Sequence, residues 1–230
     1  MAVTMNTVIR SLRSPEEREA ALEEASRLLK QGALVAIPTE TVYGLAADAL
    51  HEASVREIFA VKGRPQDNPC IVHIASADML PDLVTDIPAA YRPLMDAFWP
   101  GPLTLLFPKA RTIPSAVTCG LATVGIRLPD QADTRALIQR TGRPLAAPSA
   151  NRSGRPSPTT AQHVLADLNG RIPLILDAGP CAVGVESTVL AADGNALRIL
   201  RPGGVTPDDI RRITGQDPVC DPGHRSRPPG

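Results

Sequence analysis

The sequence predicts an α/β fold, with a twisted, open and mostly mixed sheet flanked by helices. Short apolar segments alternate with segments of helical periodicity along most of the 230 residues. Toward the C-terminus, apolar segments follow one another within residues 173–202, with no helical segment between them. Strands that follow one another directly favour antiparallel pairing, so we expect a mixed sheet rather than a purely parallel one.

The first helix and strand carry the clearest local signals. Ser14 can cap a helix whose first turn holds Pro15, and Gly32 can close it. Leucines and alanines recur on one face between these ends, as in an amphipathic helix. The apolar run at residues 33–38 follows as a buried strand.

The same alternation recurs along the rest of the chain. Further helices are expected at residues 54–63, 89–99, 133–142, 159–170 and 206–215, and strands at 70–75, 103–108, 124–129, 144–150, 173–179, 186–192 and 196–202. We expect one catalytic domain over residues 1–215. Residues 216–230 hold four prolines and two glycines, so we expect a tail or linker there.

Composition and charge argue against several classes of protein. The chain has 43% hydrophobic and 21% charged residues, and basic and acidic side chains number 24 each. Balanced charge provides no overall field that would attract nucleic acid or a membrane. The four cysteines form no CxxC pair, which argues against a zinc site or a redox dithiol, and we assign no metal ligand in the protein. We find no apolar signal core or membrane-spanning run, and expect a cytoplasmic protein without a membrane partner.

The segment "KGRPQDNP" places two cations at the predicted end of a helix. Lys62 is one of only 3 lysines against 21 arginines, and Gly63 separates it from Arg64. Asn68 adds an amide to the same loop. Two interpretations are open: a solvated helix C-terminus, where cations complement the helix dipole, or an anion-binding loop.

Two further loops gather polar side chains directly after predicted strands, where open α/β sheets place their ligands. In "PTETVYG", hydroxyls and a carboxylate crowd a short turn that includes Thr39, Thr41 and Tyr43. Its hydroxyls could equally bond their own backbone. In "PSANRSGRPSPTT", Ser149 and Asn151 lie in a loop that could hold an oxyanion or be a proline-rich surface connection.

Cations also occur in or beside predicted strands. Arg127 lies within an apolar strand and needs a partner, which a protein carboxylate or a bound one could supply. Arg201 ends a late strand, and His73 lies within an earlier one, where a packed core residue is the alternative to a ligand. Together with Lys62 and Arg64, these arginines predict a concave cationic cleft for a polyanion and a small carboxylate.

Six motifs stand in order along the chain: "PTETVYGLAADA", "KGRPQDNPCIVHI", "WPGPLTLLFP", "TVGIRLPD", "PSANRSGRPSPTTAQHV" and "GVESTVL…ILRPGGVT". In this order they resemble the YrdC-type threonylcarbamoyl-AMP synthase family, over roughly residues 15 to 215. The resemblance implies a YrdC-like fold and a nucleotidyltransferase. Such an enzyme joins L-threonine, bicarbonate or CO2, and ATP into L-threonylcarbamoyl-AMP, releases pyrophosphate, and uses Mg2+ with the ATP. A separate tRNA threonylcarbamoyl transferase takes the product.

The resemblance also implies roles for the residues singled out above. Lys62 and Arg64 match the family's catalytic pair. The implied ATP-binding residues are Lys62, Arg64, Asn68, Ser149, Asn151 and Arg201. The implied threonine-binding residues are Thr39, Thr41, His73, Arg127 and Ser187. Tyr43, Thr123 and Ser157 are further candidates, and Glu186 and Asp48 are candidate outer-shell partners of Mg2+.

Two alternatives and one open question accompany this resemblance. A double-stranded RNA or tRNA-binding module without catalysis is one alternative, although zero net charge and 3% aromatic residues offer little to RNA beyond a weak contact. A carbamoyl-transferring relative is the other, but the cysteine spacing supplies no zinc finger. Longer family members carry a second domain after a Pro/Gly-bearing linker, and the sequence does not decide whether one belongs here.

Overall fold

The computed structural model describes residues 5–194 and 196–220. Its strands are β1 Val8–Ser11, β2 Val35–Ile37, β3 Gly44–Asp48, β4 Val72–His73, β5 Leu103–Pro108, β6 Thr123–Arg127, β7 Leu145–Ala146, β8 Leu174–Asp177, β9 Thr188–Asp193, β10 Ala196–Arg201 and β11 Val219–Cys220. Its helices are α1 Pro15–Lys30, α2 Glu52–Lys62, α3 Arg92–Phe98, α4 Ser115–Thr118, α5 Ala132–Thr141, α6 Ala161–Leu168 and α7 Pro207–Thr214, with short 3-10 turns η1 Ala77–Asp82 and η2 Ala89–Tyr91.

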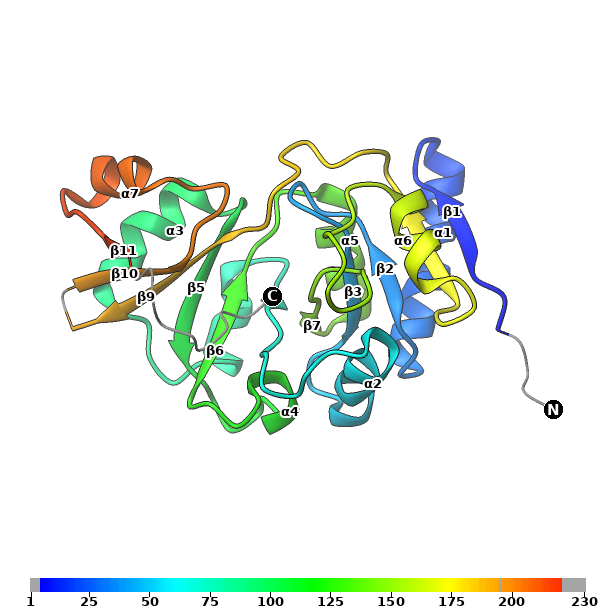
Figure 1. The fold of residues 1–230 in the computed structure, drawn as a ribbon, viewed down its shortest axis with the longest axis horizontal. Coiled ribbons are helices and arrows are strands. Elements are labelled where there is room, and N and C mark those ends of the chain that lie inside the picture. Colours follow the sequence, from blue (N-terminus) through cyan, green and yellow to red (C-terminus); the bar gives the residue numbers. More distant parts are fainter. Residues whose placement is uncertain (1–4, 195, 221–230) are drawn as a thin grey trace.

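The described strands form one open sheet in the order β1-β8-β2-β3-β7-β4-β6-β5-β9-β10-β11. The sheet contains parallel pairs, such as β1 with β8 and β4 with β6, and antiparallel pairs, such as β2 with β3 and β5 with β6. The predicted mixed, open sheet is therefore confirmed. Figure 1 shows α1 and α6 near one end of the sheet, α3 and α7 at the other, and α2 beside α4 below the middle, while α5 lies near β3 and packs against α1.

The middle of the sheet is built from short strands that bring distant segments together. In β4 and β6, His73 pairs with Arg127, so these two side chains are neighbours across the sheet. Gly44, at the start of β3, forms an isolated bridge with Ser149 just beyond β7. Four segments far apart in sequence thus meet at one edge of the central strands.

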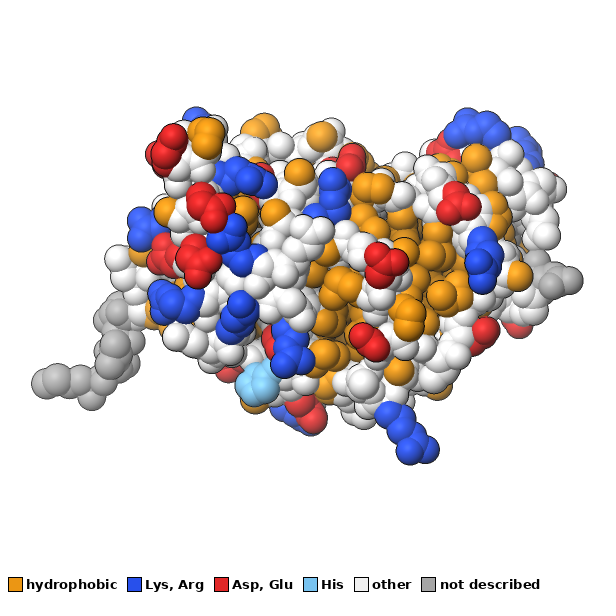
Figure 2. Space-filling model, turned by 180° about the vertical axis from the view of Figure 1, so that it is seen from behind, with side chains coloured by type: hydrophobic (Ala, Val, Ile, Leu, Met, Phe, Trp, Pro, Cys, Tyr) orange, Lys and Arg blue, Asp and Glu red, His pale blue; other side chains and the backbone are white. Residues whose placement is uncertain are grey.

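Hydrophobic side chains fill the space between the sheet and its helices. Tyr43, Tyr91 and Phe107 are among the largest fully buried side chains, and the Tyr91 and Phe107 rings meet edge to face at 5.1 Å. On the surface seen from behind the view of Figure 1, Figure 2 shows hydrophobic side chains gathered in the middle, between flanks with many charged ones. Over residues 5–194 and 196–220, no helix has both the length and the apolar character needed to span a bilayer.

Three strands differ from the sequence prediction. The turn after β2 leads directly into β3, whereas the sequence analysis treated this segment as part of a polar loop; glycine and alanine are poor strand formers. Burial between β2 and β7 overrides that propensity. β1 was also missed. β11 pairs with β10 inside the segment predicted as a tail, so the fold continues past residue 215, while residues 221–230 lie outside the described part.

At Gly203 the backbone packs closely against the backbone of residues 186–188. A Cβ at this position would press on the carbonyl oxygen of Glu186 and lie 2.5 Å from the carbonyl carbon of Ser187. Backbone atoms cannot yield as a flexible side chain can, so Gly203→Ala should lower the free energy of unfolding by about 3 kcal/mol or more. Urea unfolding would measure it.

Gly142 provides the matched control. It has φ 68°, and apart from Gly142 itself and its two chain neighbours no atom lies within 4 Å of the place that an added Cβ would take. Gly142→Ala therefore carries only the left-handed backbone cost of about 1–2 kcal/mol. An equal loss in both variants would contradict the close approach at Gly203.

Candidate functional site

A pocket lies at the edge where the central strands meet. Its wall is made by residues from the turn after β2, from β4 and β6, from the loop after β7 and from the segments around β9 and β10. The lining residues are Thr39, Thr41, Val42, Gly44, Ile71, His73, Arg127, Ala147, Ser149, Glu186, Ser187 and Arg201. The structure thus brings together seven residues singled out in the sequence for binding: Thr39, Thr41, His73, Arg127, Ser149, Ser187 and Arg201.

The hydroxyls of the turn after β2 serve both their own backbone and the pocket. Thr39 Oγ1 donates to the Val42 carbonyl at 2.6 Å and accepts from two backbone N–H groups of the turn at 3.2 Å. Thr41 Oγ1 lies 2.9 Å from Thr39 Oγ1 and accepts from Nη1 of Arg127 at 2.8 Å. The bonded turn expected as an alternative is present, and it also fixes Arg127.

Arg127 has a protein carboxylate as its partner. Its side chain is buried, its Nε donates to the Gly101 carbonyl at 3.1 Å, and its Nη2 lies 2.6 Å from Oε1 of Glu40. The second oxygen of Glu40, Oε2, has no hydrogen-bond donor among the described residues. Burial lowers the pKa of Arg127, against the opposing effect of Glu40.

The protein carboxylate that the sequence allowed as a partner of Arg127 is Glu40. Sequence reasoning gave Glu40 no role, although its place in the polar turn beside Thr39 and Thr41 was visible.

His73 is neutral and buried beside Arg127. Burial, the largest cause, and the charge of Arg127 together lower the pKa of His73 to about 3. Its Nδ1 has no hydrogen-bond partner among the described residues. A neutral imidazole in this wall can offer a hydrogen bond but adds no charge.

Arg201 and Glu186 form the opposite side of the pocket. Nη1 of Arg201 lies 2.8 Å from Oε2 of Glu186, and its Nη2 donates to Ser187 Oγ at 3.0 Å and to the Ser187 carbonyl at 2.9 Å. Ser157 Oγ donates to the other Glu186 oxygen at 2.8 Å, which connects Ser157 to the pocket through this carboxylate. Burial lowers the pKa of Arg201, and Glu186 opposes that shift.

Lys62 and Arg64 are buried rather than solvated, with 3% and 9% of their surface exposed. Lys62 Nζ donates to the carbonyls of Ser149 and Asn151 and to Oδ1 of Asn151, the latter two at 2.7 and 3.3 Å. Arg64 donates to the carbonyls of Asn68 and Pro69, each at 2.9 Å. The helix ends as predicted, at Gly63 with φ 60°, but a solvated helix terminus does not describe these cations.

Three further candidates lie away from the pocket. Tyr43 points its hydroxyl at the Gly179 carbonyl, 2.7 Å away. Thr123 begins β6 at the end opposite Arg127, and Asp48 ends β3 at the end opposite Gly44, 3.9 Å from Arg143. Both residues lie at the strand ends that point away from the pocket, so Thr123 and Asp48 do not belong to it.

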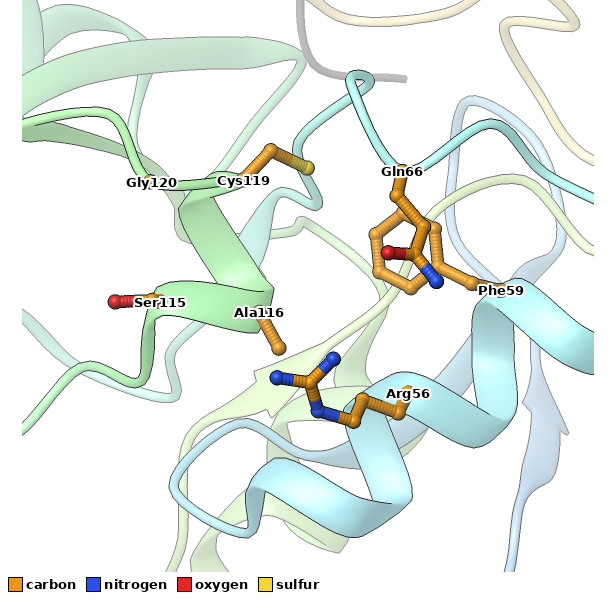
Figure 3. A pocket seen from close by; sticks show the side chains of 7 residues that line it. All are labelled: Arg56, Phe59, Gln66, Ser115, Ala116, Cys119 and Gly120. Atoms are coloured by element: carbon orange, nitrogen blue, oxygen red, sulfur yellow. The ribbon is translucent and has the colours of Figure 1, made fainter.

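A second pocket lies between α2 and α4, beside the loop that holds Arg64 (Figure 3). It has a volume of about 260 Å³ and is lined by Arg56, Phe59, Gln66, Ser115, Ala116, Cys119 and Gly120. Arg64 is near enough to act electrostatically on the Cys119 thiol. Sequence reasoning missed this pocket, because only Gln66 belongs to a motif that it singled out.

The comparisons with known proteins agree on one family. The model for Sua5, YciO and YrdC proteins, described as "Telomere recombination", matches residues 27–203. Threonylcarbamoyl-AMP synthase of Bacillus subtilis is 50% identical over 195 residues, which are 84% of this chain and 56% of that protein. The Pyrococcus abyssi enzyme of the same name is 47% identical over 210 residues, 91% of this chain and 62% of that protein.

A solved structure extends the likeness to the fold. P. abyssi Sua5, complexed with L-threonine, matches with a TM-score of 0.91 and 43% identity, covering 96% of this chain and 66% of that one. The chain spans less than two thirds of the length of the two curated relatives above. A putative threonylcarbamoyl-AMP synthase of Mycobacterium tuberculosis is 36% identical over 203 residues and is covered over 93% of its length.

The lowered pKa of Lys62 should make the stability of the protein depend on pH. Burial, the largest cause, and the charge of Arg64 together lower this pKa from 10.5 to about 7, against the opposing effects of Cys70, Glu186 and Asp167. Between about pH 7 and 10.5, unfolded Lys62 keeps a proton that the folded form has released. The unfolded chain then binds more protons, so the contribution of Lys62 to stability should rise with pH across this window.

Urea unfolding of the native chain and of Lys62→Met at pH 7, 8.5 and 10 would test this sign. The native chain should gain stability relative to the variant as pH increases. A difference that stays constant, or that falls with pH, would refute the lowered pKa.

Proposed function

The chain belongs to the Sua5, YciO and YrdC family, and we propose that it is an L-threonylcarbamoyl-AMP synthase acting as a nucleotidyltransferase. Its substrates would be L-threonine, bicarbonate or CO2, and ATP, and its second product pyrophosphate. One observation carries this proposal: a pocket walled by Arg127, His73 and Ser187 adjoins a loop held by the buried cation Lys62. An amino acid and a phosphate chain would therefore meet at one edge of the sheet.

The amino acid would occupy the side of the pocket near Arg127. The guanidinium supplies positive charge for the threonine carboxylate, and Thr41 and Glu40 hold it in place. Nδ1 of His73 offers a hydrogen bond that no described residue takes up. Together with Thr39 and Ser187, these groups are our proposed threonine-binding set.

The triphosphate would lie along Lys62, Arg64, Asn68, Ser149, Asn151 and Arg201. The carbamate oxygen formed from threonine and CO2 attacks the α-phosphorus, the bond from that phosphorus to the bridging oxygen breaks, and pyrophosphate leaves. No covalent enzyme intermediate is needed. Catalysis by Lys62 and Arg64 would then consist of positioning and of fixed positive charge where negative charge grows.

Mg2+ would accompany the triphosphate. Across residues 5–194 and 196–220, no group of three or more acidic, histidine or cysteine side chains could hold a metal by itself. An ion bound mostly by phosphate oxygens and water fits such a site, since Mg2+ retains several waters. Glu186, at the pocket wall, is the acidic side chain that could contact its water shell.

Adenosine would fit the second pocket (Figure 3). Phe59 offers an apolar wall and Gln66 an amide for the edge of a base. Arg64 acts electrostatically on Cys119 at this pocket and lies two residues from Lys62, so a bound nucleotide would run from the base past both cations to the amino acid.

The product would pass to a separate transferase that modifies tRNA, in keeping with a cytoplasmic location. The alternative, an RNA-binding module without catalysis, has less support, because the cations described above are buried in the protein rather than spread over its surface.

Pyrophosphate release from ATP and Mg2+, with threonine and bicarbonate omitted in turn, tests the proposed reaction. Release that requires both would support it and would show that this length of chain suffices. Salt-sensitive RNA binding by folded protein without threonine-dependent release would favour the alternative.

Ala116→Phe tests the adenosine pocket. The added ring would fill the space between α4 and Phe59, so we expect the KM for ATP to rise about tenfold or more, with the KM for threonine unchanged. Ala20→Phe, on the exposed face of α1, is the control and should change neither constant. Equal KM values for ATP in both variants would place the base elsewhere.

A further inference from the structure

Lys62 lies between the end of α2 and the loop of residues 149–153, which the proposed function assigns to the triphosphate. We propose that Lys62 is a positioning residue whose ammonium clamps this loop to α2, so that the loop is ordered before nucleotide binds. The inference deepens the proposed function, on which only its consequence for ATP rests. The clamp itself is a property of the ligand-free protein.

The contacts of the ammonium carry the argument. Its acceptors are the carbonyls of Ser149 and Asn151 and the Asn151 side-chain oxygen. An ammonium has three N–H bonds, so in the ligand-free protein these acceptors account for its whole donor capacity, and Lys62 would act on the triphosphate through its charge and through the loop that it holds. The backbone adds a fourth connection in the reverse direction, because the Ser153 N–H donates to the Lys62 carbonyl at 2.9 Å.

The loop needs such a clamp on this side. Toward β3 it is held by backbone, through the bridge of Ser149 with Gly44 and a 2.8 Å bond from the Ala150 N–H to the Tyr43 carbonyl. Toward α2 the described contacts run through Lys62. Charge-assisted hydrogen bonds are the stronger kind, and burial shields these from water.

Arg64 has a different target. Its Nε and Nη2 donate to the carbonyls of Asn68 and Pro69, within its own loop. The two cations of the "KGR" segment thus order two different loops: Arg64 orders the segment that follows it, and Lys62 orders a segment almost ninety residues away. Loss of Lys62 should therefore loosen residues 149–153 selectively.

Hydrogen exchange of ligand-free protein at pH 6.5 tests the clamp directly. Lys62→Met keeps an unbranched side chain but removes all three donors. We expect the Ala150 and Ser153 amides to exchange on the order of tenfold faster, since several charge-assisted bonds are lost. The Gly142 amide, bonded to Ile138 in a different part of the fold, should be unaffected. Lys109→Met, which removes a single bond to Ile113, is the matched control and should change none of them.

Chemical rescue separates hydrogen bonding from charge. In Lys62→Ala, ethylammonium should occupy the space left by the side chain and restore slow exchange of the loop. Tetramethylammonium has the charge without N–H donors and should not. If the native chain releases pyrophosphate, the KM for ATP should rise in Lys62→Ala and recover with ethylammonium, while the KM for threonine stays unchanged.

Each arm has an outcome that overturns the clamp. If the Ala150 and Ser153 amides exchange in Lys62→Met at the native rate, or if their exchange is accelerated no more than that of the Gly142 amide, Lys62 does not hold this loop in particular. Equal rescue by both cations would mean that charge alone matters. Failure of the native chain to release pyrophosphate would refute the proposed function but leave the exchange result standing.

Discussion

Burial of cations is the constraint on which the site depends. Lys62, Arg64 and Arg127 each have less than a tenth of their surface exposed. The chain as a whole has no net charge, so it has no excess of acidic residues to balance these cations. A buried ion without oxygen partners would cost several kcal/mol, so each cation has to gather acceptors around it. Lys62 and Arg64 use carbonyls, whereas Arg127 uses a carboxylate, a hydroxyl and a carbonyl.

These acceptors lie on loops, so the cations also determine loop structure. Lys62 holds the loop after β7, Arg127 holds the turn after β2, and Arg201 holds the segment before β9. The mixed sheet makes this possible because β3, β7, β4 and β6 are neighbours in space although they lie far apart in sequence. The pocket lies between these loops, and the cations that line it are already held in place by hydrogen bonds and ion pairs.

Much of this architecture could be predicted from periodicity, and the site from residue chemistry. The mixed sheet, the helix end at Gly63 and the grouping of Thr39, His73, Arg127 and Ser187 were expected, the last through family resemblance. The alanine-rich β3 was missed because its stability comes from two flanking strands rather than from propensity. A partner for Arg127 was required by its burial, but choosing Glu40 needs the turn geometry, which is a tertiary property.

The pocket beside Ala116 could not be predicted because it depends on how α4 packs against α2, and a four-residue helix gives little periodic signal.

The most direct test of the account is a crystal structure of this chain with L-threonine and a non-hydrolysable ATP analogue. We predict that threonine lies among Thr39, Arg127 and Ser187, with the phosphates on the loop held by Lys62. The threonine nitrogen should then lie close enough to the α-phosphorus for a carboxyl group on that nitrogen to bridge the two atoms. Phosphates bound away from residues 149–153, or threonine outside the Arg127 pocket, would contradict the claim that the buried cations build one site for both substrates.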